Sequence, residues 1–133
     1  MIKNFILSLF ISGSLFAQSE AYDALKVFEP FIGEWFSKHN SIGAFEGLPK
    51  DKQIESYTKY EWITDKTAVK ETWRATYPNS DKRVNVGSIV YVLDPLTNTI
   101  KTKHFGYDGN VYWTGKGWVE SKDSTVYVYT EEM

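Results

Sequence analysis

The fold class is decided by residues 54–76, which read IESYTKYEWITDKTAVKETWRAT. Residues 54–63 alternate, so that one face of a strand carries Ile54, Ser56, Thr58, Tyr60 and Trp62 and the other carries Glu55, Tyr57, Lys59 and Glu61. Asp65-Lys66 marks a tight turn, and residues 67–76 alternate again, with Val69, Glu71, Trp73 and Ala75 opposite Lys70, Thr72 and Arg74. A period of two predicts two antiparallel strands of a sheet that has one face in water.

The rest of the chain after Gly33 also has strand character. The other expected strands are residues 34–38, 86–93, 99–105, 111–114, 118–121 and 125–130, separated by turn signals that include Gly115-Lys116-Gly117. A short helix is expected over residues 20–31, where Tyr22, Leu25, Phe28 and Phe31 recur every three residues. We therefore predict an all-β fold: an antiparallel up-and-down meander of about eight strands that closes into a barrel, preceded by a short helix.

The first residues, MIKNFILSLFISGSLFA, have the features of a secretory signal peptide. Lys3 supplies the positive charge, an apolar stretch follows, and Ala17 precedes polar residues, so cleavage is expected after Ala17. The apolar stretch is short for a bilayer span, which predicts no stable membrane anchor after cleavage. We expect residues 1–17 to be the signal peptide, residues 18–133 to be one barrel domain, and the protein to be periplasmic or extracellular.

Composition excludes several classes of function. Aromatic residues make up 17% of the chain and the net charge is -2 without a basic block, which argues for a packed core and against nucleic-acid binding. The absence of cysteine excludes disulfides, thiolate nucleophiles and Cys-based zinc sites. With His39 and His104 as the two histidines, no metal-ligand spacing is present, and no cofactor is expected.

Three segments resemble a known family. Gly33-Glu34-Trp35 after a short helix is similar to the opening Gly-x-Trp motif of lipocalins and other calycins, and residues 87–97 and 104–109 resemble exported lipocalin-like bacterial proteins of unknown function. The resemblance covers residues 25–130 and implies a barrel with a cup-like interior but no catalytic set. The chain also has a weaker likeness to the haem-binding nitrobindins. It lacks the glycine-alternating first strand of that family, so haem binding is not implied. The chain stops after an expected strand, so either the barrel is minimal or a final strand is missing.

Candidate site residues lie on the face expected to point inward. Trp35 is expected to plug the core, and ligand contact is weighed against simple packing for Tyr60, Trp62, Trp73, Tyr112 and Trp113. Glu71 is the most informative polar residue, because an inward carboxylate needs a partner. His104 also points inward, and a Glu71–His104 pair would be an acid/base candidate; a structural hydrogen bond is the alternative. Arg74 and His39 are expected at the surface.

Three functions follow from this pattern. The first is an exported protein that binds a small apolar or amphipathic ligand through Tyr60, Trp62, Glu71, Trp73, His104 and Trp113. The second is an isomerase or hydrolase that uses Glu71 and His104. The third is an interaction module that pairs through an open sheet edge, either with a partner or as a homo-oligomer. We expect binding rather than catalysis.

Overall fold

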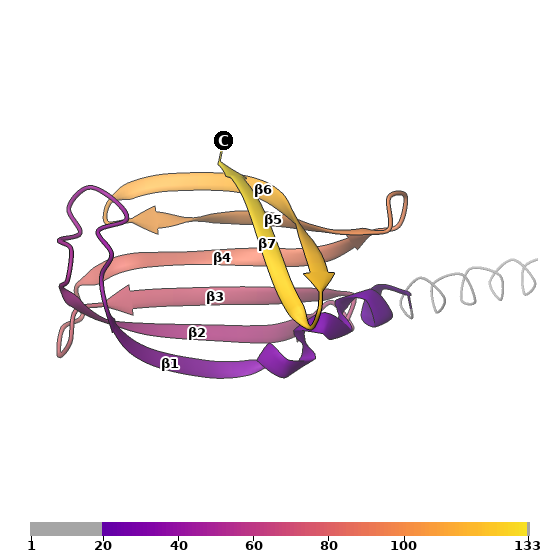
Figure 1. Cartoon of the computed structure of the whole chain (residues 1–133), viewed down its shortest axis with the longest axis horizontal. Helices are drawn as coiled ribbons and strands as arrows, with labels where there is room; N and C mark the ends of the chain where they lie inside the picture. The colour runs from indigo at the N-terminus through magenta and orange to yellow at the C-terminus, as the bar shows by residue number, and fades with distance from the viewer. Residues whose placement is uncertain (1–19, 133) are drawn as a thin grey trace, which may run out of the picture.

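The computed structural model describes residues 20–132, which form one antiparallel sheet and one helix (Figure 1). The expected signal peptide lies outside the described residues. Residues 20–25 are α-helical and lead into the 3₁₀-helix η1 (Lys26–Phe31). The strands are β1 (Gly33–Asn40), β2 (Gln53–Ile63), β3 (Ala68–Thr76), β4 (Arg83–Asp94), β5 (Thr99–Asp108), β6 (Val111–Lys122) and β7 (Thr125–Glu132).

The sheet is a simple meander. Within residues 20–132 its seven strands follow one another in sequence order, each antiparallel to the next. The sheet curves into a half-barrel, and β1 and β7 form its two edges (Figure 1). The predicted all-β meander with a short helix is confirmed in this coarser form.

The count of strands differs from the expected eight because β6 runs through Gly115 and Gly117. Both glycines pair in register with β5, opposite His104 and Thr102, and with β7. A Cβ on Gly115 would collide with the His104 ring, and one on Gly117 would collide with the carbonyl of Tyr129. These glycines therefore make room for a cross-strand ring and a close backbone, and do not mark a turn.

One face of the sheet, the inner face, carries an apolar core at each end. At one end Leu25 and Phe28 of the helix pack on Val69, Tyr91 and Val119, which lie on β3, β4 and β6. At the other end Leu48, from the loop of residues 41–52, packs with Ile54, Ala75 and Val84. The helix and the loop lie at opposite ends of the half-barrel in Figure 1, so the middle of the inner face remains between them.

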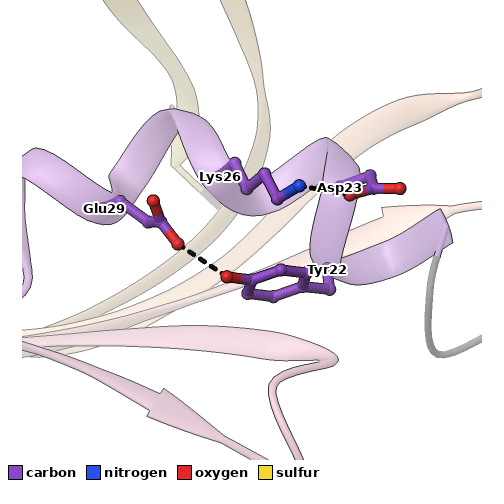
Figure 2. A network of polar contacts seen from close by, with 4 residues as sticks. All are labelled: Tyr22, Asp23, Lys26 and Glu29. Carbon is purple, nitrogen blue, oxygen red and sulfur yellow. Dashed lines mark hydrogen bonds and ion pairs between the residues drawn. The ribbon is translucent and has the colours of Figure 1, made fainter.

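The helix is held at its exposed side by a small polar network (Figure 2). The Tyr22 hydroxyl donates to Glu29 Oε1 at 2.7 Å, and Lys26 Nζ lies 2.6 Å from Asp23 Oδ1. The Tyr22 ring in turn lies 5.3 Å, centroid to centroid, from the ring of Trp62 on β2. This contact joins the polar network to the sheet and fixes where the helix covers the inner face.

Candidate functional site

The six residues predicted to contact a ligand all lie on the inner face. Cross-strand pairs share a face of a sheet, and the register pairs Tyr60 with Glu71 and Trp62 with Val69. Further along the same face, Trp73 lies opposite Gly87, His104 opposite Gly115, and Trp113 opposite Gly106. Tyr60 and Trp62 pack against the core that Leu25 and Phe28 form with the sheet, the helix core. The other four lie further along the inner face, between the two apolar cores. We refer to Tyr60, Glu71, Trp73, His104 and Trp113 as the central cluster.

Glu71 lies between two tyrosine hydroxyls. The Tyr91 hydroxyl donates to Glu71 Oε2 at 2.6 Å, and Tyr60 forms a side-chain hydrogen bond with the same carboxylate. Burial, followed by the negative charge of Glu71, raises the pKa of both tyrosines above the ordinary value. The two phenols therefore stay protonated and hold the carboxylate as hydrogen-bond donors. This contact supplies the partner that an inward carboxylate requires.

His104 is almost fully buried on β5. Its ring lies beside Gly115 and 5.7 Å, centroid to centroid, from the ring of Trp113 at an interplanar angle of 56°. The register places Glu71, Ile89 and His104 in one cross-strand row, so that one strand separates the two ionisable groups. The two side chains thus share a face, as the sequence predicts, with Ile89 between their positions.

Two tryptophans cover the middle of the inner face. Trp73 on β3 and Trp113 on β6 stack with ring centroids 5.9 Å apart and an interplanar angle of 15°. Their rings lie over Gly87 and Gly106, where an added Cβ would collide with Trp73 and Trp113 respectively. Two glycines on neighbouring strands thus form a floor on which the indole rings lie flat.

A hydrogen-bond chain positions the Trp73 ring. Trp73 Nε1 donates to Asn85 Oδ1, and Asn85 Nδ2 donates to Asp108 Oδ1. Sequence reasoning missed Asn85, Asp108 and Tyr91: the first two lie outside the strands expected at residues 86–93 and 99–105, and Tyr91 was not among the candidate site residues. Cross-strand register, which no single segment contains, brings these residues together.

Two aromatic predictions are wrong. Trp35 does not plug the core: it is 52% exposed on the edge strand β1, and its Nε1 donates to the Phe31 carbonyl at 2.6 Å. Tyr112 does not face the cluster, because its neighbour Trp113 does and successive residues of a strand point to opposite faces. Tyr112 instead lies on the outer face with its ring 5.4 Å from that of Tyr107. Arg74 and His39 are exposed, as expected.

Comparison with known proteins adds no assignment. No protein-family model, no curated protein and no solved structure matches the chain. In the part of the chain that the structure describes, no group of three histidine, aspartate or glutamate side chains is placed to hold a metal ion. Within residues 20–132, no helix is long and apolar enough to cross a membrane. The function is therefore argued from the central cluster.

Proposed function

We propose that the chain binds a small amphipathic molecule on the inner face of the half-barrel, as an exported, lipocalin-like carrier protein in the periplasm or outside the cell. The observation that carries this proposal is the carboxylate of Glu71, held by Tyr60 and Tyr91 beside the Trp73–Trp113 stack. Ligand sites are mostly apolar surfaces with a few convergent polar groups, which describes this cluster.

The cluster favours a ligand with both an aromatic or apolar part and a hydrogen-bond donor. An ionised carboxylate has about four lone-pair positions, and the two tyrosines use two of them. The remaining positions accept from a ligand N–H or O–H group. The indole rings of Trp73 and Trp113 supply the apolar contact.

Closure of the barrel is part of the same proposal. In a seven-stranded meander β1 and β7 run parallel to each other, because successive strands alternate in direction. Antiparallel closure into a lipocalin-like barrel therefore requires an eighth strand between them, and a second copy of the chain that pairs at an edge is one source of it. A closed wall would cover the bound ligand and strengthen its polar contacts.

A fluorescence titration tests the binding proposal. N-phenyl-1-naphthylamine has two aromatic parts and one N–H donor, so its emission should rise on binding to the wild-type chain. Replacing Glu71 with leucine removes the acceptor, which should weaken binding about tenfold or more, because a hydrogen bond to a charged group contributes about 1.5–3 kcal/mol and about 1.4 kcal/mol is tenfold. The matched control is Glu46→Leu, which replaces an exposed carboxylate in the loop of residues 41–52 and should leave binding unchanged.

Native mass spectrometry of protein purified from its host provides the second readout and should detect a retained small molecule. An empty protein that also fails to raise the emission of the probe would overturn the binding proposal. Equal affinity of the Glu71→Leu and Glu46→Leu variants would remove Glu71 from the site.

An isomerase or hydrolase is the second candidate, because Glu71 and His104 lie on one face in one cross-strand row. A ligand that spans the position of Ile89 would reach both groups, as general acid/base catalysis requires. Mass spectrometry of a recovered ligand after prolonged incubation separates the two functions. An unchanged mass and isomer composition supports binding alone, whereas turnover that Glu71→Gln and His104→Asn each abolish supports catalysis.

A further inference from the structure

The outer face of the sheet has a groove that the inner-face proposal does not use. Its volume is about 610 Å³, and it crosses β1 to β4. One wall is the cross-strand row of Glu34, Lys59 and Thr72, and the other is the row of Phe36, Tyr57 and Arg74. A second recess of about 530 Å³ lies on the far side of Tyr57 and Arg74 and reaches Asn79 in the β3–β4 connection. Together they form one outer groove that Tyr57 and Arg74 divide.

Two aromatic rings stand exposed at this groove. Phe36 is 51% exposed and Tyr57 is 50% exposed, and their ring centroids are 4.8 Å apart with a tilt of 42°. The rings pack on each other, and Lys38 Nζ lies 5.7 Å from the centroid of the Phe36 ring, while about half of each aromatic side chain stays exposed. The same cross-strand row continues through Val86 to Tyr107 and Tyr112, two further exposed aromatics. Exposed apolar surface of this extent, bordered by polar groups, is typical of a binding surface.

The charges around the groove balance. Lys38 Nζ lies 2.7 Å from Glu55 Oε1, and Lys59 Nζ lies 2.9 Å from Glu61 Oε2. Arg74 donates from Nη2 to the backbone carbonyl of Asp81 at 3.1 Å and has further N–H groups in its fork. The groove therefore offers many donors and acceptors without the surplus of positive charge that a polyanion requires. A purely apolar ligand would desolvate these polar groups without replacing their hydrogen bonds.

We propose that the outer groove binds a neutral polysaccharide chain. A sugar ring has an apolar C–H face and a rim of uncharged hydroxyl groups. The C–H face fits the exposed rings of Phe36 and Tyr57, and the hydroxyl rim fits the balanced polar side chains Thr72, Arg74 and Asn79. A groove that continues across neighbouring strands on both sides of Tyr57 suits several linked rings better than one free sugar.

Affinity gel electrophoresis of the full chain tests the proposal. The gels contain β-glucan, xylan, galactomannan or dextran as neutral polymers, and dextran sulfate as the charged comparison. We expect at least one neutral polymer to retard the wild-type protein. Phe36→Ala and Tyr57→Ala should each weaken that retardation at least tenfold. The matched control is Tyr127→Ala, an exposed aromatic on β7 away from the groove, which should stay within twofold of wild type.

Circular dichroism of each variant establishes that the sheet is intact, which is expected because all three side chains are about half exposed. Three results would overturn the proposal: no retardation in any neutral gel, retardation by dextran sulfate alone, or undiminished retardation of Tyr57→Ala. Sedimentation velocity identifies another occupant. Self-association that Tyr57→Ala abolishes, together with the absence of polysaccharide binding, would assign the groove to a second copy of the chain and likewise overturn the proposal.

Discussion

Replacing Tyr91 with phenylalanine isolates one hydrogen bond of the central cluster. The Tyr91 side chain is 1% exposed, and its ring packs 4.4 Å, centroid to centroid, from that of Phe28. Phenylalanine keeps this packing and removes the hydroxyl that donates to Glu71 at 2.6 Å. A hydrogen bond to a charged group contributes about 1.5–3 kcal/mol. Because Glu71 is only half-buried and keeps its bond to Tyr60, we expect the lower end of that range, a loss of about 1.5 kcal/mol.

The measurement is urea unfolding followed by tryptophan fluorescence. With a denaturant slope of about 1.5 kcal/mol per molar, typical of a small domain, the midpoint should fall by about 1 M. Tyr57→Phe is the control, because the Tyr57 ring lies half exposed on the outer face, and it should change the free energy of unfolding by less than about 0.5 kcal/mol.

A double-mutant cycle with Glu71→Leu assigns the loss to the Tyr91–Glu71 pair. Residues that share a hydrogen bond should show a coupling energy of about 0.5–3 kcal/mol. If Tyr91→Phe destabilises the chain no more than Tyr57→Phe does, or if the two substitutions at the pair are additive, the cluster is not held together by this bond. In that case the carboxylate is stabilised mainly by solvent.

Three further predictions concern pH, packing and the glycine floor. Burial raises the pKa of Tyr91 in the folded chain, so the stability that its protonated hydroxyl contributes is present below about pH 10 and is lost as pH rises above that value. Between about pH 9 and 11 the urea midpoint of Tyr91→Phe should therefore fall less steeply than that of the wild type. Phe28→Ala should lower the free energy of unfolding, measured by thermal or urea unfolding, by about 3–5 kcal/mol. Phe31→Ala should lower it by less than about 1 kcal/mol, because Phe31 is 40% exposed. Equal losses would contradict the packing of Phe28 in the helix core. Gly87→Ala should lower the free energy of unfolding by about 1–3 kcal/mol, because the added Cβ collides with the Trp73 ring. The loss should be smaller in a Trp73→Ala background, and an unchanged loss would show that this collision is not its cause.

Local alternation predicted most of the fold. The period of two in residues 54–76 placed Glu71 and Trp73 on the inner face, and the observed register agrees. The same reasoning split β6 at Gly115, because a glycine pair reads as a turn when the ring on the neighbouring strand is unknown. Alternation also says nothing about which edge strands meet, so barrel closure did not follow from it. Trp35 was assigned to the core because large aromatics usually lie there, but its strand is an edge.

The partners of the site residues were harder to predict than the residues themselves. Glu71 indicated an inward carboxylate from its own strand alone, whereas Tyr91 is 20 positions away and meets it only through the β3–β4 register. Asn85 and Asp108 are residue types that are common in turns. The hydrogen bonds that link them to Trp73 join β3, β4 and β5, so they depend on the pairing of three strands. A sequence pattern therefore identifies which groups need partners, and the sheet determines which partners they have.

The distribution of apolar and polar groups along the inner face connects stability to binding. The helix core with Leu25 and Phe28 and the loop core with Leu48 occupy the two ends of this face. The ends therefore bury the apolar side chains that stabilise the half-barrel, while the stretch between them holds a carboxylate, an imidazole and two indoles, and the phenols of Tyr60 and Tyr91 lie where it meets the helix core. Burying so many polar groups stabilises a fold little, since each must recover the hydrogen bonds that it loses from water. Their concentration between two apolar cores is expected if the middle of the face serves binding and the ends serve folding. Substitutions at Glu71 should then change ligand affinity more than substitutions at Phe28 that leave the chain folded.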